Sequence, residues 1–464
     1  MKIGLISLGC PKNLVDSEVM LGLARDAGHE LTHDASGADV LVVNTCAFID
    51  AAKRESVDTI LEMARFKTDG ACRRLIVTGC LAERYRSELQ KEIPEIDAVL
   101  GTGEVPDIVG AIGGAPPVTG SAPLTFFRSS SGPAAKDASV LTSPSYLYDA
   151  DTPRLRATPK HYAYMKVAEG CDYTCAFCII PALRGSYRSR PIESLVREAR
   201  QLAAQGVREL LLISQDTSFY GVDRGERGGL ARLLRALNDV DGLEWIRVLY
   251  LYPTTIDDAT LAAMAECDKV CRYIDLPLQH AADSVLKRMG RPGTRRTYEA
   301  LLDRIRWRVP GVTIRTTFIV GFPGETEDDV GALSSFVREQ AFDHVGVFTY
   351  SHEEGTRAFA FADDIPSDVK QARRRAIMGL QKRIVRIRQH GRRGERVRVR
   401  VDGPTGDHDL VWKGRLASQA PDIDPVAYFT EVDPSGLKPG TLVDAEVVGS
   451  RDYDLIVRPV EGRR

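Results

Sequence analysis

The 464-residue chain carries almost no net charge, and no stretch of it is apolar for long. Its 62 basic and 64 acidic side chains leave a formal charge of −2, so the whole chain has no bias towards polyanions. No window approaches the ~18 apolar residues that a membrane helix needs, which argues against a membrane protein. The apolar stretch 3–8 is too short for a signal peptide, and we therefore expect a cytoplasmic protein.

Cysteine and histidine are scarce. Nine cysteines in 464 residues are too few for a disulfide framework, and in the cytoplasm they stay reduced. The eight histidines show no metal-ligand spacing, and no glycine pattern matches a Walker or Rossmann fingerprint. The cysteines are nevertheless clustered, and reduced cysteines at close spacing favour metal binding or catalysis.

Three of the cysteines share one short run at CxxxCxxC spacing, Gly170-Cys171-Asp172-Tyr173-Thr174-Cys175-Ala176-Phe177-Cys178. Three thiolates this close can hold three irons of a [4Fe–4S] cube and leave the fourth iron open, as at a catalytic metal. No further cysteine follows for 88 residues, so a fourth ligand is not near. Zinc is the alternative, although zinc sites usually combine CxxC pairs across a longer loop.

The fold class predicted is α/β, beginning with a parallel-sheet domain over residues 1–115, because strands alternate there with charged, periodic helices. The expected strands are 2–9, 39–45 and 74–79, and the expected helices are 17–27, 53–66 and 83–92. Residues 116–158 are rich in Gly, Ser and Pro and predict a linker with little regular structure.

Residues 159–393 predict a partial (β/α)6 barrel, whose sites lie at the carboxyl ends of its strands. The expected strands are 162–168, 209–214, 245–251, 273–278, 313–320 and 344–350. A long helix over 367–393 follows, with ten basic side chains against Asp368. Residues 394–464 predict a small antiparallel β-barrel, with strands 396–401, 410–416, 427–432, 442–448 and 454–457.

A second set of three cysteines lies in the first domain, each directly after an expected strand: Cys10, Cys46 and Cys80. Ligands of an open parallel sheet gather outside the strand carboxyl ends, so three cysteines there can converge. Helices that start after them would aim N–H groups at an anionic cluster. A second [4Fe–4S] site is the hypothesis, and three buried structural cysteines are the alternative. Cys267 and Cys271 have no third ligand nearby.

Taken together, these residues resemble the methylthiotransferase family, whose members join an N-terminal three-cysteine domain, a radical S-adenosylmethionine (SAM) core and a C-terminal TRAM barrel. The resemblance covers essentially the whole chain. It implies two [4Fe–4S] clusters and SAM as cofactors. The implied ligands are Cys10, Cys46 and Cys80 for an auxiliary cluster, and Cys171, Cys175 and Cys178 for the SAM cluster.

Within the family, the chain is most similar to the branch that modifies an aspartate of the twelfth small-subunit ribosomal protein. The segments that carry this similarity are Ser7-Leu8-Gly9-Cys10-Pro11-Lys12-Asn13, Asn44-Thr45-Cys46-Ala47-Phe48-Ile49, Ser214-Gln215-Asp216-Thr217-Ser218, Leu249-Tyr250-Leu251-Tyr252-Pro253 and Pro277-Leu278-Gln279-His280. The tRNA-modifying branch typically has Gln-Met-Asn and Gln-Asn-Val-Asn at two of these places, and neither occurs here. The resemblance implies transfer of a methylthio group to the aspartate β-carbon, with one SAM as methyl donor and one as radical source.

Several residues of the barrel mouth are candidate SAM contacts. Phe177 is expected to shield the cluster, and Gln215 and Gln279 end the second and fourth expected strands. Gly321 and Glu325 lie in a turn that resembles the adenine-side turn of the family, where glycine permits close backbone approach. The alternative for this turn is a tight βα connection without a ligand.

Three arginines after the cluster loop, Arg184, Arg188 and Arg190, are candidate substrate contacts. Arginine pairs carboxylates in a bidentate way, so these side chains could clamp the substrate aspartate or the SAM carboxylate. The alternative is a solvated or interdomain run of ion pairs.

Two other functions remain open at this point, tRNA methylthiolation and a non-enzymatic two-cluster electron carrier. A barrel that grips RNA should be basic, whereas this one has ten basic and thirteen acidic side chains and suits a basic ribosomal protein. Carriers usually close their clusters, which argues against the second alternative. We expect a low-potential electron donor such as flavodoxin or ferredoxin, and the basic helix 367–393 is a candidate RNA contact.

Overall fold

The computed structural model describes residues 1–113, 144–406 and 410–460. Its internal contacts divide the chain into two compact units. The first unit comprises Met1–Ala157, Glu169–Asp172 and Ile179–Tyr187, and the second comprises Thr158–Ala168, Tyr173–Cys178 and Arg188–Arg464. Most of the expected linker lies outside the described residues, and its described part, 144–158, forms no helix or strand.

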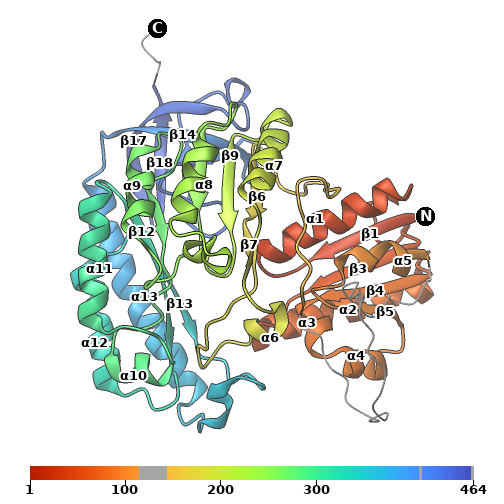
Figure 1. The fold of residues 1–464 in the computed structure, drawn as a ribbon. Coiled ribbons are helices and arrows are strands. Elements are labelled where there is room, and N and C mark those ends of the chain that lie inside the picture. The colour runs from red at the N-terminus through yellow and green to blue at the C-terminus, as the bar shows by residue number, and fades with distance from the viewer. Residues whose placement is uncertain (114–143, 407–409, 461–464) are drawn as a thin grey trace. The chain divides into compact units, whose positions relative to one another are not determined.

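A five-stranded parallel sheet is the centre of the first unit (Figure 1). Its order is β2 (Glu30–Leu31), β1 (Lys2–Ser7), β3 (Val40–Thr45), β4 (Arg74–Gly79) and β5 (Ile96–Leu100). β3 is buried along its whole length because both faces of a parallel sheet are covered, which fits its run of valines and leucine. The three expected strands are confirmed, and β2 and β5 are additional.

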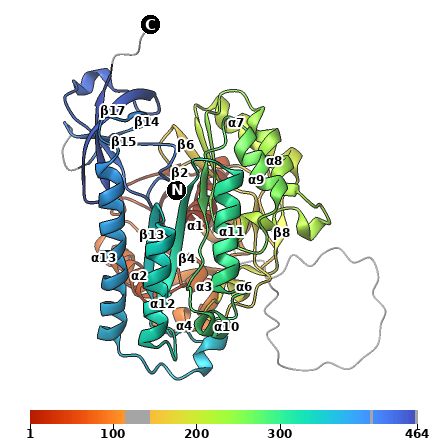
Figure 2. The same ribbon diagram turned by 90° about the vertical axis from the view of Figure 1, so that its left-hand side faces the viewer.

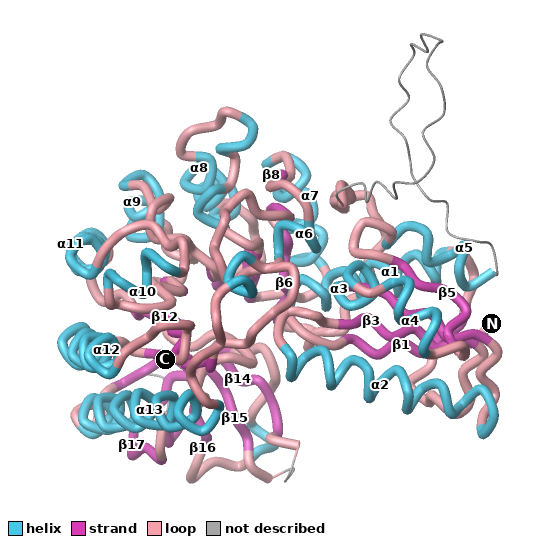
Figure 3. The backbone as a smooth tube through the Cα atoms, turned by 90° about the horizontal axis from the view of Figure 1, so that it is seen from below, coloured by secondary structure: helices cyan, strands magenta, loops and turns pink. Residues whose placement is uncertain are grey.

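Helices cover both faces of this sheet. They are α1 (Pro11–Asp26), α2 (Asp50–Asp69), α3 (Cys80–Arg84), α4 (Arg86–Glu92), η1 (Val105–Asp107), α5 (Ile108–Gly113) and α6 (Ile180–Arg184). Figure 3 shows α1 and α5 on one face and α2 on the other. α1 begins six residues before the expected start because Pro11, whose φ angle already suits a helix, opens its first turn. The expected helix 83–92 is two helices that break at Tyr85.

Six parallel strands form a partial barrel in the second unit, which confirms the expected (β/α)6 core. They are β6 (Tyr162–Lys166), β9 (Glu209–Ile213), β10 (Trp245–Val248), β11 (Tyr273–Asp275), β12 (Thr313–Val320) and β13 (His344–Thr349). The ladder runs from β6 through β9 to β10, and from β11 through β12 to β13. The two halves are joined by the Leu251 N–H, which donates to the Asp275 carbonyl at 2.9 Å, and by the Cys271 N–H on the Ile246 carbonyl at 2.8 Å.

Helices between these strands cover the outside of the barrel. They are α7 (Ile192–Ala204), α8 (Gly229–Asn238), α9 (Asp258–Glu266), α10 (Asp283–Arg288), α11 (Arg295–Arg308) and α12 (Glu327–Gln340). Short elements are β7 (Ala168–Glu169), β8 (Arg188–Ser189), η2 (Thr217–Phe219), η3 (Val222–Arg224) and η4 (Arg357–Ala360). Capping boxes at Thr294 and Thr326 start α11 and α12, and the barrel strands and helices share one apolar core.

The long helix α13 (Ser367–His390) leads into a closed five-stranded barrel (Figure 2). Its strands are β14 (Arg396–Pro404), β15 (Trp412–Arg415), β16 (Ala427–Phe429), β17 (Leu442–Arg451) and β18 (Asp454–Pro459), with η5 (Pro434–Gly436) between β16 and β17. The expected barrel is confirmed, and four of its strand pairs are antiparallel, but β16 and β18 pair in parallel. A ring with an odd number of strands cannot alternate direction all the way round, so one neighbouring pair must be parallel.

None of the helices that the structure describes combines the length and the apolar composition needed to cross a bilayer. α13, the longest of them, carries charged side chains along its whole length.

Candidate metal centres

Cys10, Cys46 and Cys80 each lie at the carboxyl edge of the first unit's sheet. Cys10 caps α1, Cys46 directly follows β3, and Cys80 begins α3. β1 and β3 are neighbours although β2 lies between them in sequence, so Cys10 and Cys46 flank the point where strand order reverses. Ligands of doubly wound sheets bind at such a point.

Burial controls the ionisation of two of these thiols. It raises the pKa of Cys46 and raises the pKa of Cys80 to about 12, and the neighbouring charge of Cys10 raises both further. The charge of the Arg184 guanidinium opposes this rise and acts to lower the pKa of both thiols. The three sulfur atoms therefore lie close enough to sense one another's charge.

Asn13, in the first turn of α1, joins the loops that carry the three cysteines. Its side-chain N–H groups donate to the carbonyls of Leu8 at 3.1 Å and Thr45 at 2.7 Å. Its Oδ1 lies 3.8 Å from the Sγ of Cys80. Asn13 lies in a segment that resembles the family, but its role is not predictable from the sequence because neither carbonyl partner is visible from spacing.

Gly9 allows the first of these loops to approach the second. Its φ is +87°, and a Cβ added there would lie 2.8 Å from the Cβ of Cys46. A residue with a side chain would therefore be strained in its backbone and would push Cys46 away.

The three cysteines fit a multi-iron cluster better than a single ion. Among residues 1–113, 144–406 and 410–460, no group of three or more His, Cys, Asp or Glu side chains is arranged to hold one metal ion. A cluster of four irons spreads its thiolate ligands more widely than one ion does. Three sulfurs that come from three separate loops and sense one another's charge suit such a group.

Arg184 contacts the first cysteine set, in the first unit. Its Nη2 donates to the Sγ of Cys80 at 3.6 Å, and its Nη1 donates to Asp16 at 2.9 Å and Glu169 at 3.1 Å. Burial alone would lower the pKa of Arg184, but the charges of Glu169, Cys80 and Asp16 outweigh it and hold the pKa well above its usual value. This placement argues against the predicted contact of Arg184 with a substrate.

The residues of the CxxxCxxC run divide between the two units: Cys171 belongs to the first, Cys175 and Cys178 to the second. All three are partly exposed. In the second unit, the loop is held by the Ala176 N–H, which donates to the Met289 carbonyl at 2.7 Å, and by the Cys178 N–H on the Cys175 carbonyl at 3.2 Å.

Cys175 lies beside a buried arginine and a tyrosine. The Nη1 of Arg291 donates to its Sγ at 3.7 Å, and the Tyr252 hydroxyl lies 3.9 Å from the same atom. The Arg291 guanidinium also covers the Tyr252 ring, 4.2 Å from its centroid. Sequence reasoning missed Arg291, which follows Cys175 by more than a hundred residues and has no motif of its own.

Tyr173 and Asp216 extend this group. The Tyr173 ring stacks on Tyr252 with 3.9 Å between centroids, and its hydroxyl donates to Asp216 at 2.8 Å. Burial raises the pKa of Asp216, and hydrogen bonds from Ser218, Tyr173 and Thr255 oppose the rise. A fixed aromatic stack therefore lies next to the cluster loop.

Gln279 has the features expected of a ligand contact at the barrel mouth. It follows β11 with φ +73°, a conformation that costs a residue with a Cβ about 1–3 kcal/mol. Its side-chain Oε1 is buried and accepts no hydrogen bond from any residue that the structure describes. An unsatisfied buried amide oxygen fits a site whose ligand supplies the donor. Gln215 follows β9 and is partly buried, as expected for the same mouth.

Gly321 and Glu325 form a closed turn after β12. The Gly321 N–H donates to both carboxylate oxygens of Glu325, at 2.9 and 3.0 Å. The carboxylate also pairs with Arg373 at 2.9 Å. A Cβ on Gly321 would lie 2.3 Å from the aliphatic part of the Lys370 side chain. Glycine at this position therefore leaves room for Lys370. Their contact with SAM stays a prediction, as does the shielding role of Phe177, which packs on an apolar cluster of the second unit.

Arg188 and Arg190 belong to the second unit and differ in exposure. Arg190 is 2% exposed and pairs with Glu198 at 2.6 Å, so its guanidinium is already engaged within the fold. This argues against Arg190 as a substrate contact, and its ion pair is buried within the second unit and is neither solvated nor interdomain. Arg188, in β8, is partly exposed, and its substrate contact stays a prediction.

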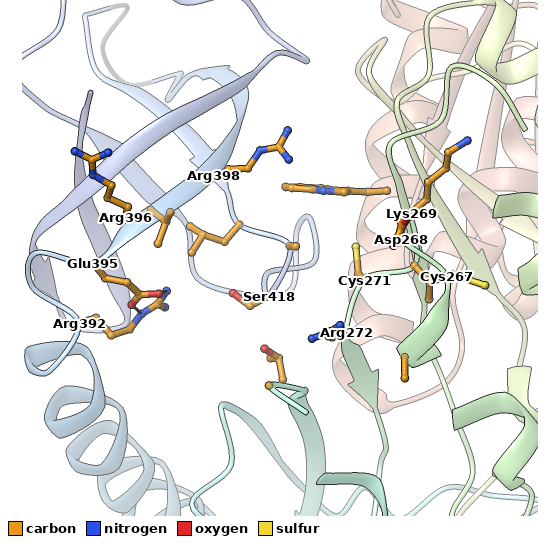
Figure 4. Close-up of a pocket in the computed structure, with 18 residues that line it drawn as sticks. Cys267, Asp268, Lys269, Cys271, Arg272, Arg392, Glu395, Arg396, Arg398 and Ser418 are labelled. Carbon is orange, nitrogen blue, oxygen red and sulfur yellow. Dashed lines mark hydrogen bonds and ion pairs between the residues drawn. The ribbon is translucent and has the colours of Figure 1, made fainter. Parts of the chain in front are cut away.

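Cys267 and Cys271 line a pocket of about 550 Å³ in the second unit (Figure 4). The pocket lies at the amino ends of the barrel strands, since Trp245 and Thr313 begin β10 and β12. Burial raises the pKa of both thiols, which keeps them protonated. This pocket is therefore at the end of the barrel opposite to the cysteine run.

Three family models and several relatives match this chain. Residues 2–101 match the uncharacterized protein family UPF0004, residues 165–337 the Radical SAM superfamily, and residues 394–460 the TRAM domain. Over 98% of its length the chain is 47% identical to a protein of Koribacter versatilis named ribosomal protein uS12 methylthiotransferase RimO, covering 96% of it. A protein of the same name from Trichlorobacter lovleyi is 44% identical over 99% of the chain and 98% of its own length.

The chain belongs to the RimO methylthiotransferase family. The predicted resemblance is confirmed, and the chain is a radical SAM methylthiotransferase enzyme whose cofactors are SAM and [4Fe–4S] clusters. The RimO assignment removes the electron-carrier alternative and does not favour the tRNA alternative. The residues that hold the cofactors stay predictions.

Solved structures support the fold of this RimO family member. The radical SAM methyltransferase TsrM of Kitasatospora setae aligns with a TM-score of 0.52 at 18% identity, over 75% of this chain and 72% of TsrM. The cobalamin-dependent radical SAM enzyme OxsB aligns with a TM-score of 0.50 at 11% identity, over 82% of this chain and 56% of OxsB. At such low identity the likeness concerns the fold alone.

Proposed function

We propose that this chain adds a methylthio group to the β-carbon of an aspartate on ribosomal protein uS12. The observation that carries the proposal is similarity over nearly the full length to relatives named for uS12 methylthiolation. An unactivated C–H bond offers no acidic proton to a side-chain base, so its substitution by sulfur requires removal of a hydrogen atom. When bound, the clusters and SAM supply the electron, radical, sulfur and methyl group for that substitution.

The chain's own residues would hold and orient these groups. The ligand sets are Cys10, Cys46 and Cys80 for the auxiliary cluster, and Cys171, Cys175 and Cys178 for the SAM cluster. Gln279 offers its unsatisfied amide oxygen to SAM. Tyr252 and Arg291 orient Cys175, and the stacked ring of Tyr173 shields the loop from water.

Partners follow from the reaction and the surface. The radical step needs one electron, which a low-potential donor such as flavodoxin or ferredoxin would supply in the cytoplasm. The substrate is uS12, as the free protein or within the small ribosomal subunit. The acidic C-terminal barrel suits a basic ribosomal protein, and α13 offers arginines to ribosomal RNA.

The test is a deletion strain complemented with variants, in which uS12 and tRNA are both analysed by mass spectrometry. The wild-type chain should restore the methylthio group on uS12, and neither triple Cys→Ala variant should. The matched control, Cys267→Ala with Cys271→Ala, should restore it, because these buried thiols lie outside both sets. A methylthio group restored on tRNA and absent from uS12 would replace the proposal with the tRNA alternative.

Iron content of the same variants, reconstituted without oxygen, separates the two sites. The wild-type chain and the Cys267/Cys271 control should hold about eight irons, and each triple variant about four. The variant without Cys10, Cys46 and Cys80 should still cleave SAM to 5′-deoxyadenosine, whereas the variant without Cys171, Cys175 and Cys178 should not. About eight irons in the variant without Cys10, Cys46 and Cys80 would mean that these three cysteines are structural and bind no cluster.

A further inference from the structure

The segment that follows the CxxxCxxC run in sequence packs with the first unit. Ile179 and Leu183, on either side of the first turn of α6, are buried in the same apolar core as α2 and β4. The Thr102 hydroxyl donates to the Leu183 carbonyl at 2.6 Å. α6 is thus anchored to the unit that carries Cys10, Cys46 and Cys80, although it lies directly after Cys178 in the chain.

Arg184, the last residue of α6, points into this unit and is 3% exposed. It donates to the Sγ of Cys80 at 3.6 Å and to the Oδ1 of Asn13, the residue that joins the three cysteine loops. Its other terminal nitrogen, Nη1, donates to the carboxylates of Asp16 and Glu169. Five hydrogen-bond donors on a planar fork fix the direction of this side chain more firmly than a lysine could be fixed.

The residues after Arg184 clamp Cys171, the first ligand of the other predicted set. The Cys171 N–H donates to the Gly185 carbonyl at 3.0 Å, and the Tyr187 N–H donates to Asp172 at 3.0 Å. Gly170 has φ +86°, and a Cβ there would lie 2.1 Å from the Ser186 carbonyl oxygen. The backbone around Cys171 is therefore pressed against the backbone that directly follows Arg184.

We propose that Arg184 is a positioning residue that ties the two cysteine sets together: its side chain holds Cys80, and the backbone that follows it holds Cys171. A sulfur-bearing site and a radical-generating site must act on one substrate carbon in turn, so a fixed link between a ligand of each has a direct use. Cys80, Arg184 and Cys171 all belong to the first unit, so the link lies within that unit. The inference rests on the proposed function only for the identity of the cysteines as cluster ligands.

The first test measures iron in two backgrounds, each of which keeps one cysteine set. In the chain without Cys171, Cys175 and Cys178, Arg184→Met should lower cluster affinity about tenfold, as loss of a residue that orients a metal ligand does. In the chain without Cys10, Cys46 and Cys80, the same change should leave about four irons. Arg184→Lys keeps the charge and should recover part of the loss.

The second test measures coupling in the chain with all its cysteines. Arg184→Met should raise the ratio of 5′-deoxyadenosine formed to uS12 methylthiolated by about tenfold, because SAM cleavage continues while sulfur transfer is misaligned. Arg247→Met is the matched control: Arg247 is buried and pairs with Glu209 at 3.0 Å, and within the described part of the chain it makes no hydrogen bond to a predicted ligand cysteine. The control should leave this ratio unchanged.

Three further outcomes have defined consequences. If Arg184→Met does not fold, Arg184→Met with Glu169→Gln keeps the net charge of the buried group and should show the same iron loss. Wild-type iron content and an unchanged ratio in these variants would overturn the inference. If the iron results hold and no variant, the wild type included, modifies uS12, the proposed substrate is wrong and the inference about Arg184 stands.

Discussion

At the residue scale, backbone strain marks the barrel mouth. Tyr250 and Gln279 are not glycines, yet both have φ above +60°, and they lie in the segments that follow β10 and β11. Such conformations persist only where the surrounding structure enforces them, and they cluster at functional sites. The Gln279 backbone is held on both sides, since its N–H donates to the Thr317 carbonyl and its own carbonyl accepts from Ile319.

Gln279→Gly should separate stability from function. Glycine adopts φ +73° without strain, so the variant should gain about 1 kcal/mol in the free energy of unfolding. Loss of the amide oxygen should weaken SAM binding about fivefold to tenfold, the worth of one hydrogen bond. Thermal unfolding and equilibrium SAM binding measure the two effects.

Asp452→Gly is the control for this change. Asp452 also has a positive φ, +54°, but it lies in the exposed turn between β17 and β18. Its replacement should relieve strain and leave SAM affinity unchanged. SAM binding by Gln279→Gly as tight as that of the wild type would exclude Gln279 from the site.

At the element scale, α13 uses much of its basic charge inside the second unit. Lys370 pairs with Asp363, Arg373 with Glu325 and Lys382 with Asp452. Arg375, Arg383 and Arg386 are exposed and form no ion pair within the part of the chain that the structure describes. Their spacing of eight and three residues places them on one side of the helix.

Changing Arg375, Arg383 and Arg386 together to Gln should weaken binding to small ribosomal subunits and reduce its salt dependence. Each lost phosphate contact lowers the slope of log K against log salt by about 0.7–0.9, so three contacts lower it by about two. Binding measured at several salt concentrations gives the slope. An unchanged slope would mean that this side of α13 is only solvated, and the iron content serves as the control for folding.

At the scale of the whole molecule, buried ion pairs join the closed barrel to the (β/α)6 core within the second unit. Glu209 of β9 pairs with Arg247 at 3.0 Å and with Arg415 of β15 at 2.8 Å. Burial alone would raise the pKa of Glu209, but Arg415, Arg247 and Arg400 outweigh it and hold the pKa below its usual value. Removal of one member of such a group leaves a buried charge without compensation.

Stability of the second unit should therefore fall in acid. A carboxyl whose pKa is lowered by folding stabilises the fold above its unfolded pKa of about 4.5, and that contribution is lost as the pH falls through the folded value. Glu209→Gln should lower the free energy of unfolding by about 3 kcal/mol at pH 7. In this variant the free energy of unfolding should also depend less on pH below about 4.5. Denaturant unfolding at pH 7 and pH 4 measures both.

Glu431→Gln is the matched control for Glu209→Gln. Glu431 pairs with Arg458 at 3.1 Å but is 61% exposed, so its replacement should change stability by less than about 1 kcal/mol. An equal loss in the free energy of unfolding of the two variants would mean that burial does not determine how much these ion pairs contribute to stability.

The sequence alone determined the features that depend on local pattern. Strands and helices follow from runs and periods of apolar residues, so all six barrel strands and the main strands of the first sheet were predicted. Both cysteine sets could be proposed as ligands because each thiol lies within a short motif or directly after a strand. The family followed from the order of these motifs along the chain.

Only the tertiary structure decided which distant side chains meet. Arg184 looked like a substrate clamp from its place after the cluster loop, but the packing of α6 on the first unit turns it towards Cys80. Asn13 and Arg291 gained roles from partners that lie far from them in sequence. The parallel β16–β18 pair likewise follows from closing five strands into a ring. The physical reason is common to all four: local propensity selects elements, whereas burial and hydrogen bonding between remote segments select contacts.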